Sequence, residues 1–378
     1  MENKRLGDIA TYINGYPFKP EDRGAEGLPI IRIQDLTGNA YDLGFYNGEY
    51  PKRVEINDGD VLISWSASLG VYLWDRGKAL LNQHIFKVVF DKVDIDKQYF
   101  IYAVQHKLKE MESKTHGATM KHIVKKDFDN TVIPFPSLEQ QAEIASALSK
   151  AANIIDLRRQ QLSDLDDLIK ARFVEMFRTY PSNENGWPTG TIRDLVTEVR
   201  YGSSRKAAEG DSGKYPYLRM NNITYSGELD LSDTKTIDIP DDELDKCTVH
   251  RGDLLFNRTN SKELVGKTCV YNRDEQMVLA GFVVRVRLNE KALPEFVSAF
   301  MNTSFSKQML LGMCKAAIGQ ANINAQELQN IGIYIPPIKL QREFVSFKEQ
   351  IDKSKSVVQK SLDETQLLFD SLMQKYFG

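Results

Sequence analysis

The chain has 378 residues, of which 42% are hydrophobic and 27% are charged, so it can form two or three globular domains and is neither disordered nor fibrous. A net charge of -3 and a pI near 6.1 exclude a general basic surface, so any contact with nucleic acid needs local patches. The N-terminal segment MENKRLGDIATYING lacks the apolar core of a signal peptide, and no run of about 18 apolar residues predicts a membrane span. We therefore expect a cytoplasmic protein without a membrane partner.

Residues 1–137 consist mainly of short β-type runs that are separated by Gly, Asp and Asn turn signals. Two of these runs are GDVLISW at 59–65 and HIFKVVF at 84–90, and a helical pattern follows at 99–113. This mixture predicts a compact α+β domain.

Residues 138–178 contain almost no Gly or Pro and predict one long helix. A helix of about 40 residues is about 60 Å long. The linker TYPSNENGWPTG, at 179–190, ends the helix and opens the next domain. Apolar residues recur along the helix at heptad-like spacing and form a stripe that needs a partner: Leu148, Ile155, Leu162, Ile169 and Met176.

The rest of the chain repeats the first half. Residues 127–177 align with 327–377 at a constant offset of 200, with identities that include Pro136/Pro336 and Gln141/Gln341. The chain is therefore predicted to hold two copies of one domain and its helix, and the second helix supplies the partner stripe. Upstream the offset drifts, as loops of different length require: 28–37 matches 215–224, 57–64 matches 250–257, and 84–90 matches 282–288. The predicted domains are 1–137 and 191–337, and the predicted helices are 138–178 and 338–378.

One family shows the same order of segments. An α+β domain that ends in GATMKHI is followed by PFPSLEQQ, a long helix, the linker NENGWP and then the whole unit again. This order resembles the DNA specificity (S) subunit of type I restriction-modification systems. The resemblance implies two target recognition domains, each reading one half of a bipartite site in double-stranded DNA. It also implies two long antiparallel coiled-coil spacer helices and an internal duplication with pseudo-twofold symmetry.

The resemblance extends to partners. It implies that methyltransferase subunits dock on this scaffold and that an endonuclease subunit joins the complex. The chain itself would be non-catalytic and would need no cofactor. The methyltransferase would use S-adenosylmethionine and flip the target adenine out of the helix, because chemistry on a base requires taking it out of the stack.

Enzyme motifs are incomplete in this sequence. LVGKT at 264–268 resembles the end of a phosphate-binding loop, but Ser261 stands where that loop needs glycine. PDDELDK at 240–246 resembles a nuclease carboxylate cluster, but Leu244 stands where a nuclease needs an acid. Two alternatives stay open: a non-catalytic coiled-coil adaptor whose duplicated heads bind protein or glycan, and a divergent nuclease. Neither a catalytic nor a metal site is predicted, because the five histidines form no HExxH motif and no CxxC pair occurs among Cys247, Cys269 and Cys314.

Two pairs of corresponding stretches offer side chains that match phosphates or base edges. The first pair, NGYPFK at 14–19 and RYGSSRK at 200–206, surrounds a glycine turn. The second pair, at 63–68 and 256–262, follows a matched strand, and a polar turn is the alternative interpretation. Within it, Arg258 could bind a guanine through two hydrogen bonds. The candidate DNA-binding residues are Tyr16, Lys19, Ser203, Ser204, Arg205 and Lys206 in the first pair, and Ser64, Trp65, Ser66, Asn257, Arg258, Thr259 and Asn260 in the second.

Two further pairs complete the set. HGATMKHI at 116–123 and AIGQANI at 317–323 are glycine-containing loops that could approach the DNA backbone closely, or could cap a helix. Lys87/Arg285 and Arg32/Arg219 lie in matched apolar strands, where they could point to DNA or form an ion pair inside each domain. The candidates in the loops are Thr119, Lys121 and His122 in the first copy, and Gln320 and Asn322 in the second.

Overall fold

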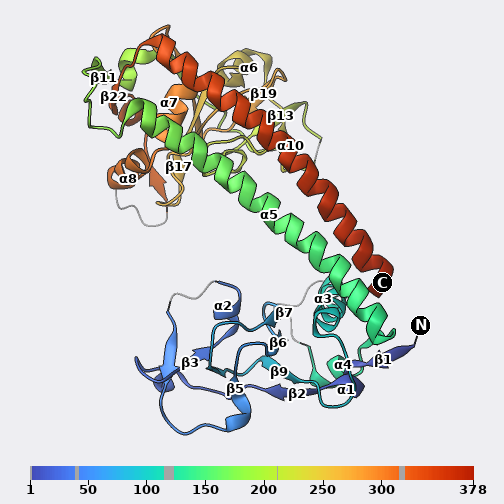
Figure 1. Ribbon diagram of the computed structural model, residues 1–378. Helices are drawn as coiled ribbons and strands as arrows, with labels where there is room; N and C mark the ends of the chain where they lie inside the picture. The colour runs from blue at the N-terminus through green and yellow to red at the C-terminus, as the bar shows by residue number, and fades with distance from the viewer. Residues whose placement is uncertain (1, 39–41, 115–122, 211, 315–319) are drawn as a thin grey trace. The chain divides into compact units, whose positions relative to one another are not determined.

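The computed structural model describes residues 2–38, 42–114, 123–210, 212–314 and 320–378 (Figure 1). The chain divides into two compact units: Met1–Arg159 with Gln359–Gly378 form unit 1, and Gln160–Val358 form unit 2. We call residues 2–137 head 1 and residues 189–337 head 2. From the sequence, the predicted boundaries fall between the heads and the long helices. In the structure each long helix is itself divided, with one part in unit 1 and the other in unit 2.

Unit 1 contains a mixed head and parts of both long helices. The strands of head 1 are β1 (Asn3–Arg5), β2 (Thr11–Asn14), β3 (Leu28–Ile31), β4 (Gly44–Tyr46), β5 (Glu55–Ile56), β6 (Val61–Ser64), β7 (Gly70–Leu73), β8 (Ala79–Leu81), β9 (Ile85–Val89) and β10 (Val132–Pro134). Its helices are α1 (Leu6–Ile9), α2 (Ile33–Leu36), α3 (Lys97–Lys114) and α4 (Lys125–Asp129), and the long helix α5 (Leu138–Phe177) follows.

Unit 2 contains the second head. Its strands are β11 (Thr189–Thr191), β12 (Val196–Tyr201), β13 (Tyr215–Leu218), β14 (Lys235–Ile237), β15 (Thr248–Val249), β16 (Leu254–Asn257), β17 (Thr259–Asn260), β18 (Thr268–Val270), β19 (Met277–Leu279), β20 (Val283–Leu288), β21 (Ala321–Asn322) and β22 (Gly332–Tyr334). Its helices are α6 (Asp241–Cys247), α7 (Pro294–Met301), α8 (Ser304–Met313) and α9 (Ala325–Gln329), and the long helix α10 (Ile338–Phe377) follows.

The two heads share one sheet topology. The sheet β2-β9-β6-β7 of head 1 has the same strand order as β12-β20-β16-β18 of head 2. The sheet β4-β3-β8-β5 likewise matches β14-β13-β19-β15, and in each of these two sheets one pair of strands, β3/β8 or β13/β19, is parallel. The predicted matches 28–37/215–224 and 57–64/250–257 join β3 to β13 and β6 to β16, so the internal duplication is confirmed.

A buried glutamine fixes each head to the start of its long helix. Gln141 is completely buried, and its Oε1 accepts from the backbone N–H of Asp96 (2.9 Å) while its Nε2 donates to the carbonyl of Pro136 (2.9 Å). Gln341 is also completely buried and makes the corresponding bonds to Leu293 N–H (2.8 Å) and the carbonyl of Pro336 (2.8 Å). The sequence around the proline is repeated because each head needs this strand-to-helix junction.

Within each unit the two long helices run antiparallel. In unit 1, Leu148 near the start of α5 shares a core with Phe377 at the end of α10, whereas Arg159 farther along α5 contacts Gln366, which precedes Phe377 (3.5 Å). In unit 2, Phe177 at the end of α5 packs on Phe344 near the start of α10 (ring centres 5.7 Å apart). Of the apolar stripe predicted from heptad spacing, Leu148 and Ile155 are buried, and Ile169 and Met176 pack against the core of unit 2, whereas Leu162 is partly exposed.

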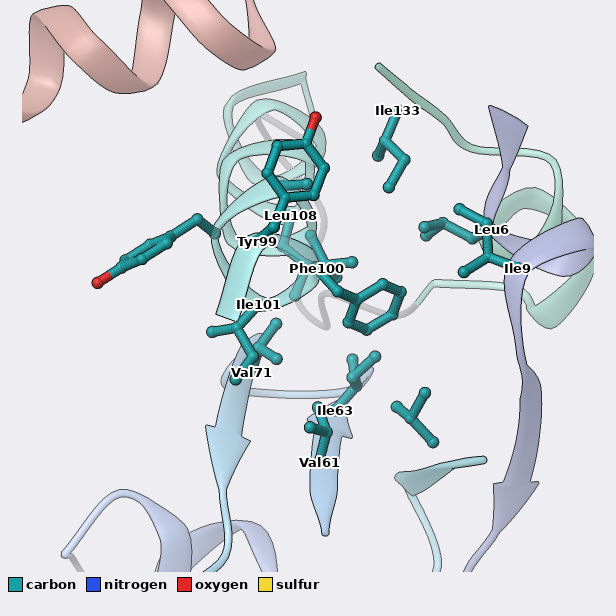
Figure 2. Close-up of a cluster of buried hydrophobic side chains, with 14 of the residues drawn as sticks. Leu6, Ile9, Val61, Ile63, Val71, Tyr99, Phe100, Ile101, Leu108 and Ile133 are labelled. Carbon is teal, nitrogen blue, oxygen red and sulfur yellow. The ribbon is translucent and has the colours of Figure 1, made fainter. Parts of the chain in front are cut away.

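The core of head 1 lies between its sheet and α3. Figure 2 shows Phe100 of α3, Ile63 of β6 and Leu6 of α1 turned toward one another. All three side chains are buried completely. At about 25 cal/mol for each Å² of apolar surface removed from water, side chains of this size each contribute about 1.5–3 kcal/mol. The helix predicted at 99–113 is therefore the element that closes this face of the sheet.

Both chain ends belong to unit 1, which predicts tolerance of circular permutation. Phe377 packs on Tyr99 (ring centres 5.2 Å apart), whose hydroxyl donates to the carbonyl of Pro134 (2.8 Å), and β10, which contains Pro134, pairs with β1. A permutant that joins the ends by a flexible linker and opens between the exposed Glu184 and Asn185 should fold, with a melting temperature within a few degrees of the parent. Circular dichroism melting measures this. An unfolded permutant beside a stable parent would contradict the arrangement.

Candidate nucleic-acid interface

A buried asparagine ends strand β16 in head 2. The side chain of Asn257 is completely buried, and its Nδ2 donates to the carbonyls of Thr259 (3.2 Å) and Phe282 (3.3 Å). Its Oδ1 accepts from Nδ2 of Asn260 (3.1 Å), whose own Oδ1 accepts from the backbone N–H of Ser261 (2.9 Å). These bonds turn the chain from β16 into β17. The amide of Asn257, a predicted DNA contact, is therefore used inside the turn.

The turn brings Arg258 and Thr259 next to Asn322, a candidate from a different stretch of the sequence. β17 pairs with β21, so that Thr259 lies opposite Asn322. Oδ1 of Asn322 accepts from Nε of Arg258 (3.2 Å) and from Oγ1 of Thr259 (3.0 Å). The guanidinium carbon of Arg258 lies 5.0 Å from the ring centre of Tyr201, within the range of a cation–π contact. We call Tyr201, Arg258, Thr259 and Asn322 the Arg258 cluster.

One exposed aromatic residue belongs to this cluster and another borders it. Tyr201 is 44% exposed at the end of β12, and Phe282 is 51% exposed. The hydroxyl of Tyr201 accepts from the backbone N–H of Ala325 (3.1 Å), which fixes the ring. Gln320, in the chain just before β21, is also exposed. The sequence prediction missed Tyr201 and Phe282. For Tyr201 a signal was available, because this residue stands directly before Gly202 in a stretch of the first candidate pair.

Head 1 has the same backbone arrangement with different side chains. The backbone N–H of Trp65 donates to the carbonyl of His84 (3.2 Å), as that of Arg258 does to Phe282 (2.9 Å). The indole of Trp65 stacks on Phe86 (5.5 Å, 23°), and its Nε1 donates to Oδ1 of Asn14 (3.3 Å). Trp65 is therefore partly buried and engaged within its own head.

The other candidates of the same stretch in head 1 differ in exposure. Ser64, a predicted DNA contact, is completely buried, and its hydroxyl donates to the carbonyl of Ser68 (2.5 Å). Ser66 is partly exposed. Three candidates of the glycine-containing loop lie outside the described residues: Thr119, Lys121 and His122.

In both stretches of the first candidate pair, the backbone of the glycine lies very close to the backbone of another segment. A Cβ atom added to Gly15 would lie 2.0 Å from the carbonyl oxygen of Asn82, and one added to Gly202 would lie 2.3 Å from that of Ala280. Only glycine fits at these two corresponding positions. Tyr16, the next residue in head 1, is partly buried, with its ring centre 4.9 Å from that of Phe18.

The polar residues after Gly202 have separate roles. Ser203, a predicted DNA contact, is buried, and its Oγ accepts from the backbone N–H of Arg205 (3.2 Å). Arg205 donates twice to Glu243 (2.7 and 3.1 Å), which lowers the pKa of that carboxyl group below its ordinary value. Ser204 and Lys206 are exposed. In head 1 the corresponding Lys19 is exposed and lies 3.8 Å from Glu21.

Comparison with known proteins identifies the family. The family model of the type I restriction modification DNA specificity domain matches residues 1–166 and 184–365. The chain belongs to this family. The specificity subunit of the type I restriction enzyme EcoKI from Escherichia coli K12 is 24% identical, over 98% of this chain and 86% of that protein. The MjaVIII specificity subunit of Methanocaldococcus jannaschii is also 24% identical, over 95% of this chain and 88% of that protein.

Two solved structures share the fold of this family member. The crystal structure of the type I restriction-modification S subunit from M. genitalium has a TM-score of 0.52 at 15% identity, covering 100% of this chain and 96% of that chain. A structure described under complex assembly and conformational transition of the type I R-M system has a TM-score of 0.58 at 16% identity, covering 100% and 97%. The α+β architecture with long helices is therefore that of type I specificity subunits.

The basic residues inside matched strands belong to the framework of this family member. Nζ of Lys87 in β9 donates to the carbonyl of Glu55 (2.8 Å) and lies 2.8 Å from Asp60. Arg285 in β20 donates to the corresponding carbonyl of Thr248 and to Glu198 (2.9 Å). The ion-pair interpretation is confirmed for both positions. It is confirmed for the other pair as well, since Arg32 pairs with Asp35 (3.0 Å) and Arg219 with Asp233 (2.9 Å).

This framework role predicts that Arg285→Lys is mild. The lysine at position 87 already donates to the equivalent carbonyl in head 1 and pairs with Asp60, whose counterpart Asp253 lies 4.0 Å from Arg285. We expect a loss of about 1–2 kcal/mol in the free energy of unfolding, because part of the guanidinium hydrogen bonding is lost. Urea unfolding measures the loss, and the modified DNA sequence should not change. A changed half-site in a folded variant would show that Arg285 takes part in reading DNA.

The described ranges, 2–38, 42–114, 123–210, 212–314 and 320–378, contain neither a membrane-spanning helix nor a cluster of metal ligands. No helix among them combines the length and apolar character that crossing a bilayer requires. No three His, Cys, Asp or Glu side chains within those same ranges form a group able to hold a metal ion.

Proposed function

We propose that this DNA specificity subunit reads a bipartite site, with each head reading one half. One observation carries the proposal: the two heads share a framework but present different side chains at one corresponding position. The shared framework includes the buried glutamine at each helix start, Gln141 or Gln341. At the end of the matched strand, head 1 has Trp65 where head 2 has Arg258. A common fold with different surface chemistry suits two readers of two different base sequences.

The proposed DNA surface consists of the candidate residues that are at least partly exposed. Arg258 is half-buried, and its guanidinium can offer paired donors to a base edge. Lys206 is an exposed cation after the glycine turn and suits a phosphate contact. The buried candidates Ser64, Ser203, Asn257 and Thr259 are left out. The residues that we retain as candidates are Tyr16, Lys19, Trp65, Ser66, Ser204, Arg205, Lys206, Arg258, Asn260, Gln320 and Asn322, together with the undescribed Thr119, Lys121 and His122.

The proposed partners follow from the family. The chain would carry no catalytic centre and would supply specificity to separate methyltransferase subunits, with an endonuclease subunit joining the same cytoplasmic complex. The methyltransferase would bring S-adenosylmethionine. Relatives named as specificity subunits of type I restriction enzymes support this assignment. The division of residues into recognition domains 1–137 and 191–337 and spacer helices 138–178 and 338–378 is part of the proposal.

Mapping of methylated adenines in the host genome tests this function. With the gene intact, we expect one bipartite motif with a fixed gap, and we expect that motif to be unmodified after deletion of the gene. The complex purified from the host should bind duplex DNA of that sequence, and the affinity should fall as salt rises. An unchanged methylation map after deletion, together with no affinity for duplex DNA, would favour the adaptor that binds protein or glycan.

A further inference from the structure

An amide, not a carboxylate, holds the guanidinium of Arg258. Nε of Arg258 can only donate, so the atom of Asn322 that faces it at 3.2 Å must be the carbonyl oxygen. The hydroxyl of Thr259 donates to the same oxygen at 3.0 Å. Asn322 therefore fixes the guanidinium without neutralising its charge.

Other arginines of head 2 are held differently. A carboxylate partner cancels the charge of an arginine and occupies its paired donors. Such an arginine must first lose its partner before it can bind DNA. Arginine–carboxylate pairs in head 2 include Arg205 with Glu243, Arg219 with Asp233, and Arg251 with Asp274.

The free donors of Arg258 are its two terminal nitrogens. Among the residues that the structure describes, neither Nη1 nor Nη2 of Arg258 forms a hydrogen bond or an ion pair. The guanidinium is also restrained by the ring of Tyr201, 5.0 Å away. A planar guanidinium that is held at Nε and offers two adjacent donors matches the O6 and N7 acceptors of guanine in the major groove.

We propose that Asn322 is a positioning residue that holds Arg258 to read one guanine in the half-site of head 2. This inference rests on the proposed function, since it assigns one base within the site that the head reads. At the corresponding position, head 1 has no arginine that an amide could hold. There the side chain is Trp65, whose Nε1 is bonded to Asn14. The guanine requirement therefore belongs to one half-site only.

The test replaces the chromosomal gene in the host and maps methylated adenines for each variant. Arg258→Lys keeps the charge but loses the paired donors. We expect it to broaden one guanine position in one half-site, with discrimination against the other bases reduced about 5- to 150-fold. Asn322→Ala should broaden the same position by a smaller factor. The other half-site should stay unchanged in both variants.

Asn322→Asp tests whether the partner of Arg258 must be uncharged. It gives Arg258 a carboxylate partner that cancels its charge and competes for its paired donors, so the purified complex should lose guanine preference at that position, and its affinity should become less salt-dependent, with a slope smaller by about one. Arg251→Lys, at an arginine already paired with Asp274, is the matched control and should leave the motif unchanged. Thermal melting verifies the folding of each variant, and Thr259→Val provides a second way to loosen Asn322.

The outcomes distinguish failure of this inference from failure of the proposed function. A wild-type complex without any sequence preference would contradict the proposed function itself. If the wild type is specific but a folded Arg258→Lys variant modifies an unchanged motif, the assignment of Arg258 to guanine is wrong. Equal loss of affinity for all sequences would assign Arg258 to a phosphate and would also overturn the inference. If Asn322→Ala broadens no position, or a different one, Asn322 does not position Arg258.

Discussion

Replacement of Gln341 by leucine is expected to lower the free energy of unfolding of unit 2 by about 3–6 kcal/mol. The leucine fills similar space but leaves three backbone groups, one buried and two partly buried, without partners. These are the N–H of Leu293 and the carbonyls of Lys291 and Pro336, which Gln341 now satisfies at 2.8, 3.0 and 2.8 Å. The unsatisfied buried carbonyl costs about 1–3 kcal/mol and each partly buried group costs less because water can reach it, so the sum is still a large part of the stability of an ordinary domain.

Hydrogen exchange followed by mass spectrometry is the suitable measurement, because a chain with two units need not unfold in one step. Peptides from head 2 and the start of α10 should exchange faster in Gln341→Leu, whereas peptides from head 1 should not. Gln141→Leu should give the reverse pattern, since Gln141 makes the corresponding bonds in unit 1. Gln350→Leu, at an exposed position on α10, is the control and should change stability by less than about 0.5 kcal/mol. Equal exchange changes in both units would show that the junctions are not local.

The elements set by local pattern could be predicted from the sequence. The helices predicted at 138–178 and 338–378 are α5 (Leu138–Phe177) and α10 (Ile338–Phe377). Heptad spacing and the lack of Gly and Pro extend over about eleven turns, so the signal is long and local. Corresponding strands of the two heads could also be matched from the sequence, because the same residue pattern occurs in both copies. The repeated Gln141 and Gln341 were visible as identities, but their buried hydrogen bonds were not.

The candidate site was only partly predictable, since its residues are joined by tertiary contacts. Arg258 and Asn322 are 64 positions apart, and only the pairing of β17 with β21 makes them neighbours. A polar residue at a strand end also has the same sequence signal whether it faces water or bonds inside the turn. Ser64 and Asn257 are of the second kind, and both are completely buried. Their exposure depends on packing that a residue type does not specify.

The phenylalanines that end the two long helices provide the second large expected effect. Phe177 is completely buried, and its ring centre lies 5.0 Å from that of Phe296 and 5.7 Å from that of Phe344. Phe177→Ala should therefore destabilise unit 2 by about 3–5 kcal/mol, since it leaves a cavity among rigid aromatic side chains that cannot close around it. Val174→Ala, at a 42% exposed position in the same turn of the helix, should cost less than about 0.5 kcal/mol and is the matched control.

Phe377→Ala tests whether the duplicated position has the same role in unit 1. Phe377 is 1% exposed and packs on Tyr99 (ring centres 5.2 Å apart), and its carbonyl accepts from Nζ of Lys107 (2.8 Å). The backbone bond survives the substitution, and the last turn of a helix can relax more than its interior, so we expect a smaller loss of about 2–4 kcal/mol. Leu367→Ala, at a 72% exposed position on α10, is the control. Urea unfolding gives the sizes of the losses, and hydrogen exchange assigns each to its unit. If Phe377→Ala matches the exposed control while Phe177→Ala is severe, α10 is held to head 1 mainly by other contacts, and the two copies differ in how they fix the end of a helix.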